Sequence, residues 1–215
     1  NVMNKEQFWN IVDEVHSSTE PRNQKEVLAA LRNRLRNLPS EEILEWKQIF
    51  SFYQDAARRN DLWAASAAMG AHSSDDGFMD FRSWLISQGR DVYMSALKDP
   101  ESLVSVNTDG QELNFEDYAY VPCKAYAERR AYEEMSVGDI LASYIKWAAT
   151  NEQQKQNDPA AGEKVMPQKS TDFFVQSAML GKYDLYDEME RRELPDDVLR
   201  SLKEDIPQRG DIADG

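Results

Sequence analysis

Apolar residues recur every three or four positions along most of the chain, which is the spacing of a helix with one buried face. Sustained alternation of apolar and polar residues, the pattern of a half-buried strand, is absent. The pattern therefore predicts an all-α fold, organised as a single irregular multi-helix bundle. The first three predicted helices offer these residues to its core: Phe8, Ile11 or Val12, and Val15; Val27, Leu28, Leu31, Leu35 and Leu38; Trp46, Phe50, Tyr53 and Ala57.

Polar caps and helix-breaking residues divide this pattern into elements. Asn4 can cap the first helix, and Ser40 can cap the third, where two glutamates follow in the first turn and favour the helix dipole. A short Ala-rich helix is expected over residues 62–69. In the Tyr-rich segment 115–132, we expect Pro122 in the first turn of a further helix, where its missing N–H costs nothing.

Changes in the spacing of apolar residues divide the chain into three predicted segments. Residues 3–149 keep the helical spacing, and we expect them to form a helical core domain. Residues 150–169 are polar, lack apolar periodicity and contain glycine and proline, which predicts a linker or mobile loop. Residues 170–215 regain apolar positions, and we expect an acidic helical appendage that packs on the core.

Residues 72–103 contain the most distinctive pattern of the chain. Ser73 or Ser74 can cap a helix that begins with two aspartates and ends at Gly89. A second helix follows and ends before Pro100. The stretch therefore predicts two consecutive helices within about thirty residues, separated by a glycine stop.

A helical wheel at about 100° per residue divides the first of these helices into two faces. The apolar face holds Phe78, Phe81, Trp84 and Leu85, with Met79 and Ile86 at its edge. The polar face, which we expect to be solvated, holds Asp76, Asp80, Ser83 and Ser87. Arg82 falls inside the apolar arc, and Asp75 lies on nearly the same line two turns earlier.

A guanidinium within an apolar face needs a carboxylate or other acceptors, because an unpaired buried charge is strongly unfavourable. One interpretation is structural: an ion pair locks the helix against the bundle, and the aspartates serve the helix start. The other is an anion-binding pocket at Arg82, with three acid or base groups beside it: His72, Asp75 and Asp76. The same charge pattern fits both, and we favour the structural interpretation. Two aromatic residues of the stretch complete the candidate site: Trp84 and Tyr93.

The string SDDGFMDFRSWLISQGRDVYMSALKDPESL, residues 74–103, resembles the signature of the DUF4240 family, a domain of unknown function. Members carry SDDGF, FR-x-WLI, G-x-x-x-Y and DP-x-x-L in this order, and the resemblance extends over residues 3–132. It implies a bacterial, mostly helical protein and no particular reaction. Members often have a cysteine immediately before SDDGF, where this chain has Ser73, so the resemblance implies no catalytic cysteine here. The matching positions are Ser74, Asp75, Asp76, Gly77, Phe78, Phe81, Arg82, Trp84, Leu85, Ile86, Gly89, Tyr93, Asp99, Pro100 and Leu103.

The formal net charge of −14 narrows the choice of partners. It disfavours nonspecific binding to nucleic acid and to anionic membranes, and it suits a basic partner. Residues 183–215 hold 11 Asp and Glu against five Lys and Arg, but without the regular spacing that mimicry of DNA would need. We therefore expect a basic protein as partner, no nucleic acid and no membrane, and the oligomeric state stays open.

Motifs for cofactors and for common catalytic chemistry are missing from the sequence. His16 and His72 are the only histidines and Cys123 is the only cysteine, so we expect no metal site, no cofactor and no disulfide framework. The patterns GxxxxGK[ST], GxGxxG, GxSxG and HExxH do not occur. No apolar run reaches the length of a membrane span, and the start NVMNKEQFW lacks a signal-peptide core. We expect a cytoplasmic protein, and we take Asn1-Val2 as foreign to the natural chain.

Two classes of function remain open. The acidic charge, the helical build and the missing catalytic motifs favour a protein-interaction or regulatory module, for instance an immunity- or antitoxin-like protein that binds a basic partner. The alternative is an enzyme or small-anion binder built on His72, Asp75, Asp76 and Arg82. A cleft that exposes Arg82 together with a carboxylate would favour the alternative, and burial of the arginine would favour the interaction module.

Overall fold

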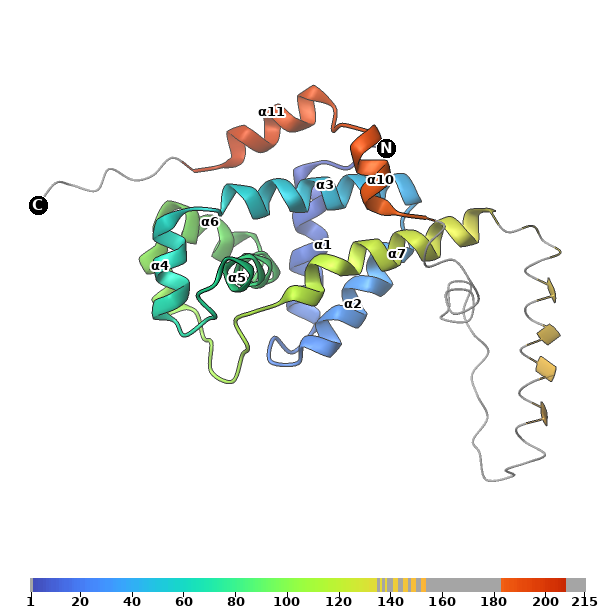
Figure 1. Cartoon of the computed structure of the whole chain (residues 1–215), viewed down its shortest axis with the longest axis horizontal. Helices are drawn as coiled ribbons and strands as arrows, with labels where there is room; N and C mark the ends of the chain where they lie inside the picture. Colours follow the sequence, from blue (N-terminus) through green and yellow to red (C-terminus); the bar gives the residue numbers. More distant parts are fainter. Residues whose placement is uncertain are drawn as a thin grey trace, which may run out of the picture.

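Helices form the regular structure of the described residues and confirm the all-α prediction (Figure 1). The computed structural model describes residues 2–134, scattered positions between 136 and 153, and residues 183–207. A 3₁₀ turn, η1, lies between α6 and α7. In chain order the elements are α1 (Lys5–Ser18), α2 (Gln24–Arg36), α3 (Ser40–Ala56), α4 (Asn60–Ala68), α5 (Asp75–Ser87), α6 (Arg90–Lys98), η1 (Pro100–Ser105), α7 (Glu116–Glu134), α10 (Leu185–Arg191) and α11 (Asp196–Asp205).

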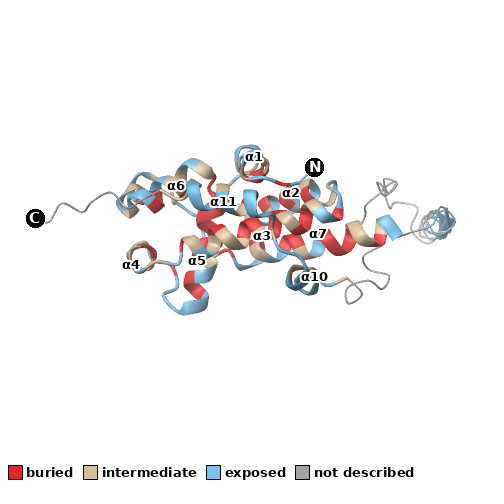
Figure 2. Ribbon diagram, turned by 90° about the horizontal axis from the view of Figure 1, so that it is seen from above, coloured by how far each residue is buried: buried red, intermediate tan, exposed pale blue. Residues whose placement is uncertain are grey.

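Helix α5 runs through the middle of the bundle and contacts α1, α3, α4, α6 and α7. Every residue from 81 to 87 is buried, and the buried positions gather at the centre of the molecule (Figure 2). The prediction that Ser83 and Ser87 face solvent is therefore wrong, because neighbouring helices cover both faces of α5 in its second half. The Ser87 hydroxyl donates to the carbonyl of Trp84 at 2.6 Å, which satisfies a polar group that water does not reach.

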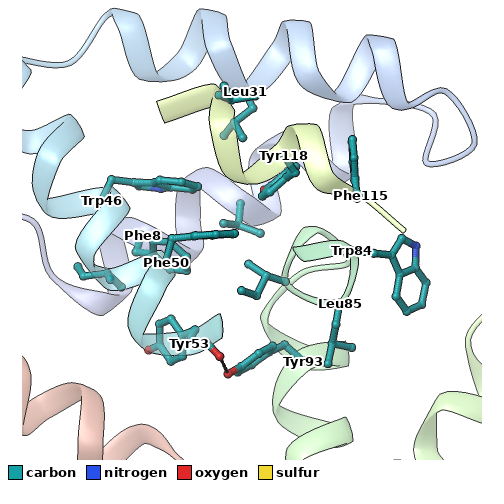
Figure 3. Packing of buried hydrophobic residues seen from close by; sticks show 14 of the residues in the cluster. Phe8, Leu31, Trp46, Phe50, Tyr53, Trp84, Leu85, Tyr93, Phe115 and Tyr118 are labelled. Carbon is teal, nitrogen blue, oxygen red and sulfur yellow. Dashed lines mark hydrogen bonds between the residues drawn. The ribbon is translucent and has the colours of Figure 1, made fainter. Parts of the chain in front are cut away.

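Large aromatic rings from α1, α3 and α6 fill the core beside α5 (Figure 3). The ring centroids of Phe8 and Trp46 lie 4.9 Å apart, and those of Trp9 and Tyr53 lie 4.8 Å apart. Tyr93 of α6 joins the same group at 5.2 Å from Trp9. Each such ring buries a large apolar area. The cluster therefore fixes α1, α3 and α6 relative to one another and brings the end of α3 close to α5 and α6.

Of the two helix caps predicted at Asn4 and Ser40, the first is confirmed and the second is wrong. Asn4 caps α1 as predicted: its side chain accepts from the backbone N–H of Gln7 at 2.9 Å, and the Gln7 side chain accepts from the Asn4 N–H. The prediction for Ser40 is wrong, because Ser40 is the first residue of α3 and Pro39 precedes the helix without a side-chain bond. Instead, Glu133 of α7 accepts from the Ser40 N–H at 3.1 Å and from its hydroxyl at 2.7 Å. A distant carboxylate thus caps the start of α3.

Helix α7 contains Pro122 in its interior, so the prediction that Pro122 lies in a first turn is wrong. A proline inside a helix donates no hydrogen bond and disturbs the carbonyls one turn earlier. The buried ammonium of Lys47 from α3 donates to the carbonyl of Ala119 in that turn, at 2.9 Å, and lies over the Phe50 ring at 4.8 Å. Burial lowers the pKa of Lys47. A tertiary donor thus supports a helix that local sequence alone would interrupt.

The described part of the C-terminal third lies against the core at two places. Helix α10 contacts α3 and α7, and the Gln48 side chain donates to the carbonyl of Arg192 just after it, at 2.5 Å. Helix α11 contacts α1 and runs above α3 in Figure 1. The predicted linker at 150–169 lies outside the described residues except for positions 152 and 153. Among the helices that the structure describes, none has both the length and the apolarity to cross a membrane.

Candidate functional site

The first turn of α5 begins as the sequence predicts. Ser74 has extended backbone angles, and its hydroxyl accepts from the N–H of Gly77 at 3.0 Å. Asp75 and Asp76 occupy the first turn and are exposed, so both carboxylates lie where the positive end of the helix dipole favours them. Ser74 is thus the N-cap, and its hydroxyl already has a structural partner.

The loop before α5 presses directly on Gly77. A Cβ atom built on Gly77 would lie 2.6 Å from both the Cβ and the carbonyl oxygen of His72, closer than real Cβ contacts allow. Asn114 joins the same place from the segment before α7: its side chain accepts from the His72 N–H at 3.1 Å and donates to the Gly77 carbonyl at 2.8 Å. Gly77 therefore serves a close backbone approach that places His72 beside the start of α5.

We expect Gly77→Ala to destabilise the protein by about 1–3 kcal/mol, because the new methyl group overlaps the His72 backbone. Helix propensity alone predicts the opposite sign, a gain of about 1 kcal/mol for this exchange in a helix. Urea unfolding followed by circular dichroism distinguishes the two. A variant with a higher unfolding midpoint than the parent would show that the His72 loop does not constrain this position.

Arg82 is buried, with 6% of its surface exposed. Its guanidinium donates to two backbone carbonyls, from Nη1 to Gln54 at 2.7 Å and from Nε to Phe78 at 3.3 Å, and lies 4.9 Å from the centre of the Phe78 ring. Burial lowers the pKa of Arg82, and the charge of Asp55 acts in the opposite direction. The carbonyl of Gln54 belongs to the last turn of α3, where helical carbonyls lack partners within the helix. Arg82 thus caps the end of α3 with a positive charge, which the helix dipole favours.

Tyr93 and Trp84 are also buried and also bind polar groups of other elements. The Tyr93 hydroxyl donates to the carbonyl of Tyr53, one residue before Gln54 in α3, at 2.5 Å (Figure 3). The Trp84 indole N–H donates to the side chain of Gln111 at 3.1 Å. Burial raises the pKa of Tyr93 well above its usual value. Both residues therefore hold the bundle together and lie away from solvent.

Gly89 allows a similar cap at the start of α6. Its φ of +98° is in the region that favours glycine, and a Cβ there would lie 2.8 Å from Oδ1 of Asp13. That oxygen accepts from the Arg90 N–H at 2.8 Å, so Asp13 of α1 caps α6. Sequence reasoning missed Asp13, because 77 positions separate the two partners and no local pattern marks the pair.

The exposed part of the stretch is acidic. His72, Asp75 and Asp76 are exposed, Asp80 is half-buried, and Glu116 at the start of α7 is exposed beside them. Burial raises the pKa of Asp80, the charges of Glu116 and Asp76 raise it further, and His72 lowers it. The N–H of Phe115 donates to the Asp80 carbonyl at 3.1 Å, which holds the starts of α5 and α7 together. Asp80 and Glu116 were not among the predicted site residues.

The structure divides the six predicted site residues into two groups. Arg82, Trp84 and Tyr93 are buried, and their polar atoms bind the protein itself. The other three are exposed at the start of α5: His72, Asp75 and Asp76. Arg82 takes its acceptors from the backbone, and no ion pair joins it to a carboxylate within residues 2–134 and 183–207. No group of three or more His, Cys, Asp or Glu side chains in the described residues could hold a metal ion.

Comparison with known proteins assigns residues 3–128, more than half of the chain, to a family described as "Protein of unknown function (DUF4240)". The match confirms the resemblance that the 74–103 string predicts. It includes α1 to α6 and the first two thirds of α7, and it ends before α10 and α11. No curated protein matches the sequence, and no solved structure matches it.

Proposed function

This chain belongs to the DUF4240 family, whose description names no reaction. From the carboxylates that are not buried around the start of α5, we propose a protein-binding module whose acidic face binds a basic segment of a partner protein. The acidic face consists of Asp75, Asp76, Asp80 and Glu116. An immunity- or antitoxin-like role, in which the module covers a basic surface of another protein, agrees with the net charge of −14.

The observation that carries this proposal is the unbalanced charge of the acidic face. None of its four carboxylates forms an ion pair with another residue in the part of the chain that the structure describes. Arg82 is the only basic residue of α5, and it points into the core toward the end of α3. Burial is the main cause of the raised pKa of Asp80, and the charges of Glu116 and Asp76 raise it further, so these carboxylates repel one another. A lysine or arginine from a partner would relieve this repulsion.

Met79 adds an apolar contact to the same face. It lies one helical turn after Asp75 and one residue before Asp80, and 39% of its surface is exposed. Methionine is flexible and adapts to different partner surfaces. The expected ligand is therefore a segment with lysine or arginine residues around an apolar side chain. The alternative, an anion site at Arg82, gains no support from a guanidinium that is buried and bound to carbonyls.

A peptide-display library tests the proposal with a defined set of ligands. We expect peptides selected on the intact protein to be enriched in lysine and arginine, and their affinity to fall as salt rises. In fluorescence anisotropy, the triple variant Asp75→Asn, Asp76→Asn, Asp80→Asn should bind such a peptide roughly tenfold or more weakly.

The matched control changes the same number of exposed carboxylates elsewhere: Asp91→Asn, Glu101→Gln and Asp109→Asn. It has the same net charge as the triple variant, so it should keep most of the affinity if the position of the acids matters. Selected peptides without basic enrichment, or an equal loss of affinity in both variants, would contradict the proposal.

A further inference from the structure

Helix α11 inserts a carboxylate between three helices of the core. Oδ2 of Asp205, the last residue of α11, accepts from the Tyr53 hydroxyl at 2.7 Å, and its Oδ1 accepts from Nη2 of Arg90 at 2.9 Å. The ammonium of Lys5 lies 3.4 Å from the same Oδ1. The Asp205 side chain is 10% exposed, so the carboxylate is nearly enclosed. We call Lys5, Tyr53 and Arg90 the carboxylate site.

Two of the three donors of the carboxylate site, Tyr53 and Arg90, are held in place by residues of the core. The Tyr53 ring is packed 4.8 Å from Trp9 within the aromatic cluster. Arg90 is held by Glu6, which accepts from its Nη1 at 2.7 Å, and its backbone N–H is bound by Asp13. All of these residues lie within the region that the family model matches. The guanidinium of Arg90 and the buried hydroxyl of Tyr53 are thus held ready for one acceptor, and a charge-assisted hydrogen bond of this kind recognises a carboxylate.

Helix α11 itself adds little else to hold it in place. Its buried apolar side chains are Val198 and Leu202, and Lys5 donates to the carbonyl of Ser201 at 3.3 Å. Helix α10, which contacts α3 and α7, is joined to α11 by the four residues 192–195. A tethered segment meets its site at an effective concentration on the order of millimolar, so even weak docking is populated within one chain.

We propose that the face formed by α1, α3 and α6 is a receptor for an acidic amphipathic helix of a partner protein, and that α11 is its resident ligand. The ligand pattern is an aliphatic residue at i, another at i+4 and a carboxylate at i+7, as in Val198, Leu202 and Asp205. The α11 of a second copy would have the same affinity without the tether, so it competes poorly. A partner helix with a better apolar face can displace α11. This receptor is separate from the acidic face and does not depend on it.

Hydrogen exchange of the intact chain, read by mass spectrometry, tests whether α11 can leave while the core stays folded. We expect amides of α11 to exchange roughly a hundredfold faster than those of α3 and α5 through local opening. Equal protection of α11 and α3 would overturn the proposal, because α11 would then be an integral part of the core.

A synthetic peptide of residues 195–207, PDDVLRSLKEDIP, provides a defined partner helix. We expect it to bind the full-length Leu202→Ala, Asp205→Asn variant, whose own α11 is weakened, at least about tenfold more tightly than it binds the parent. Adding Arg90→Gln to that variant should remove about tenfold of the affinity, and so should Asp205→Asn in the peptide.

Four results would overturn the proposal: two of the peptide experiment, one of hydrogen exchange and one of the oligomeric state. Equal affinity for the parent and the weakened variant would place the peptide elsewhere, and insensitivity to Arg90→Gln would exclude the carboxylate site. Loss of exchange protection in α3 and α5 of the weakened variant would show that α11 and the core unfold as one unit. A dimer that forms with rising protein concentration would indicate exchange of α11 between copies in place of a partner helix.

Discussion

Replacing Arg82 by alanine is expected to lower the free energy of unfolding by about 3–5 kcal/mol, because the change opens a cavity and leaves the half-buried Gln54 carbonyl without its donor. The guanidinium contacts the Gln54 carbonyl at 2.7 Å and the Phe78 ring at 4.9 Å, and 6% of the residue is exposed. Its loss therefore frees the last turn of α3 as well as the space beside α5. Urea unfolding at neutral pH measures the effect.

One further substitution separates the loss of the hydrogen-bond donor from the loss of side-chain volume, and a second serves as its control. Arg82→Met keeps much of the side-chain volume but donates nothing, and we expect it to cost about 1–3 kcal/mol, because the half-buried Gln54 carbonyl loses its donor. Arg58→Ala is the matched control, since Arg58 is exposed near the end of α3, and its change should stay within about 0.5 kcal/mol. If Arg82→Met were as stable as the parent, capping of α3 would not be the role of Arg82.

Above about pH 10 the protein should lose stability steeply, because its buried tyrosines resist ionisation while those of the unfolded chain ionise. Burial raises the pKa of Tyr53, Tyr93 and Tyr118, and the hydrogen bond to Asp205 raises that of Tyr53 further. A group whose folded pKa is raised binds more protons in the folded state, so its contribution is complete below the unfolded pKa and is lost as pH rises. Each such tyrosine contributes a slope of about 1.4 kcal/mol per pH unit.

The urea midpoint measured between pH 8 and pH 11.5 checks this expectation. Lys47 acts in the opposite direction, since burial lowers its pKa, but it is a single group against several tyrosines with a raised pKa. Tyr118→Phe is the informative variant, because the buried Tyr118 hydroxyl has no hydrogen-bond partner among the described residues and its removal should cost little at pH 7. We expect the alkaline slope to fall by about 1.4 kcal/mol per pH unit in this variant. A midpoint that stays constant from pH 9 to pH 11 would contradict the prediction.

Local sequence patterns predicted the helices, but they did not predict hydrogen bonds between residues that are distant in sequence. Asn4 and Ser74 cap helices by bonds that span three residues, and the sequence shows both partners side by side. The wheel placed Arg82 correctly in the apolar arc of α5, but its acceptor lies 28 positions away on the backbone of α3. The sequence predicted that Arg82 needs a carboxylate or other acceptors, and it could not show which, because any residue has a backbone carbonyl.

The candidate site was predictable only in part for the same reason. Spacing shows which residues share a face, and it grouped Asp76 with Asp80 correctly on one side of α5. Spacing does not show which elements cover each face, so the prediction that Ser83 is solvated was wrong: Ser83 is buried. Glu116 joins Asp80 only because the start of α7 folds back onto α5 through the Phe115 N–H. Grouping all four carboxylates of the acidic face therefore required the tertiary structure, whereas the aspartates at the start of α5 could be placed from the sequence.

Several helix ends in this bundle are closed by side chains from other helices: Arg82 and Tyr93 at the end of α3, Asp13 at the start of α6, and Glu133 at the start of α3. A short helix without its caps is marginal in water. The motif in residues 72–103 is consequently not a portable module that could be grafted onto another scaffold. Arg82 and Tyr93 bind carbonyls of α3, Gly89 makes room for Asp13 of α1, and Gly77 makes room for His72, so these residues keep their structural roles only within the bundle.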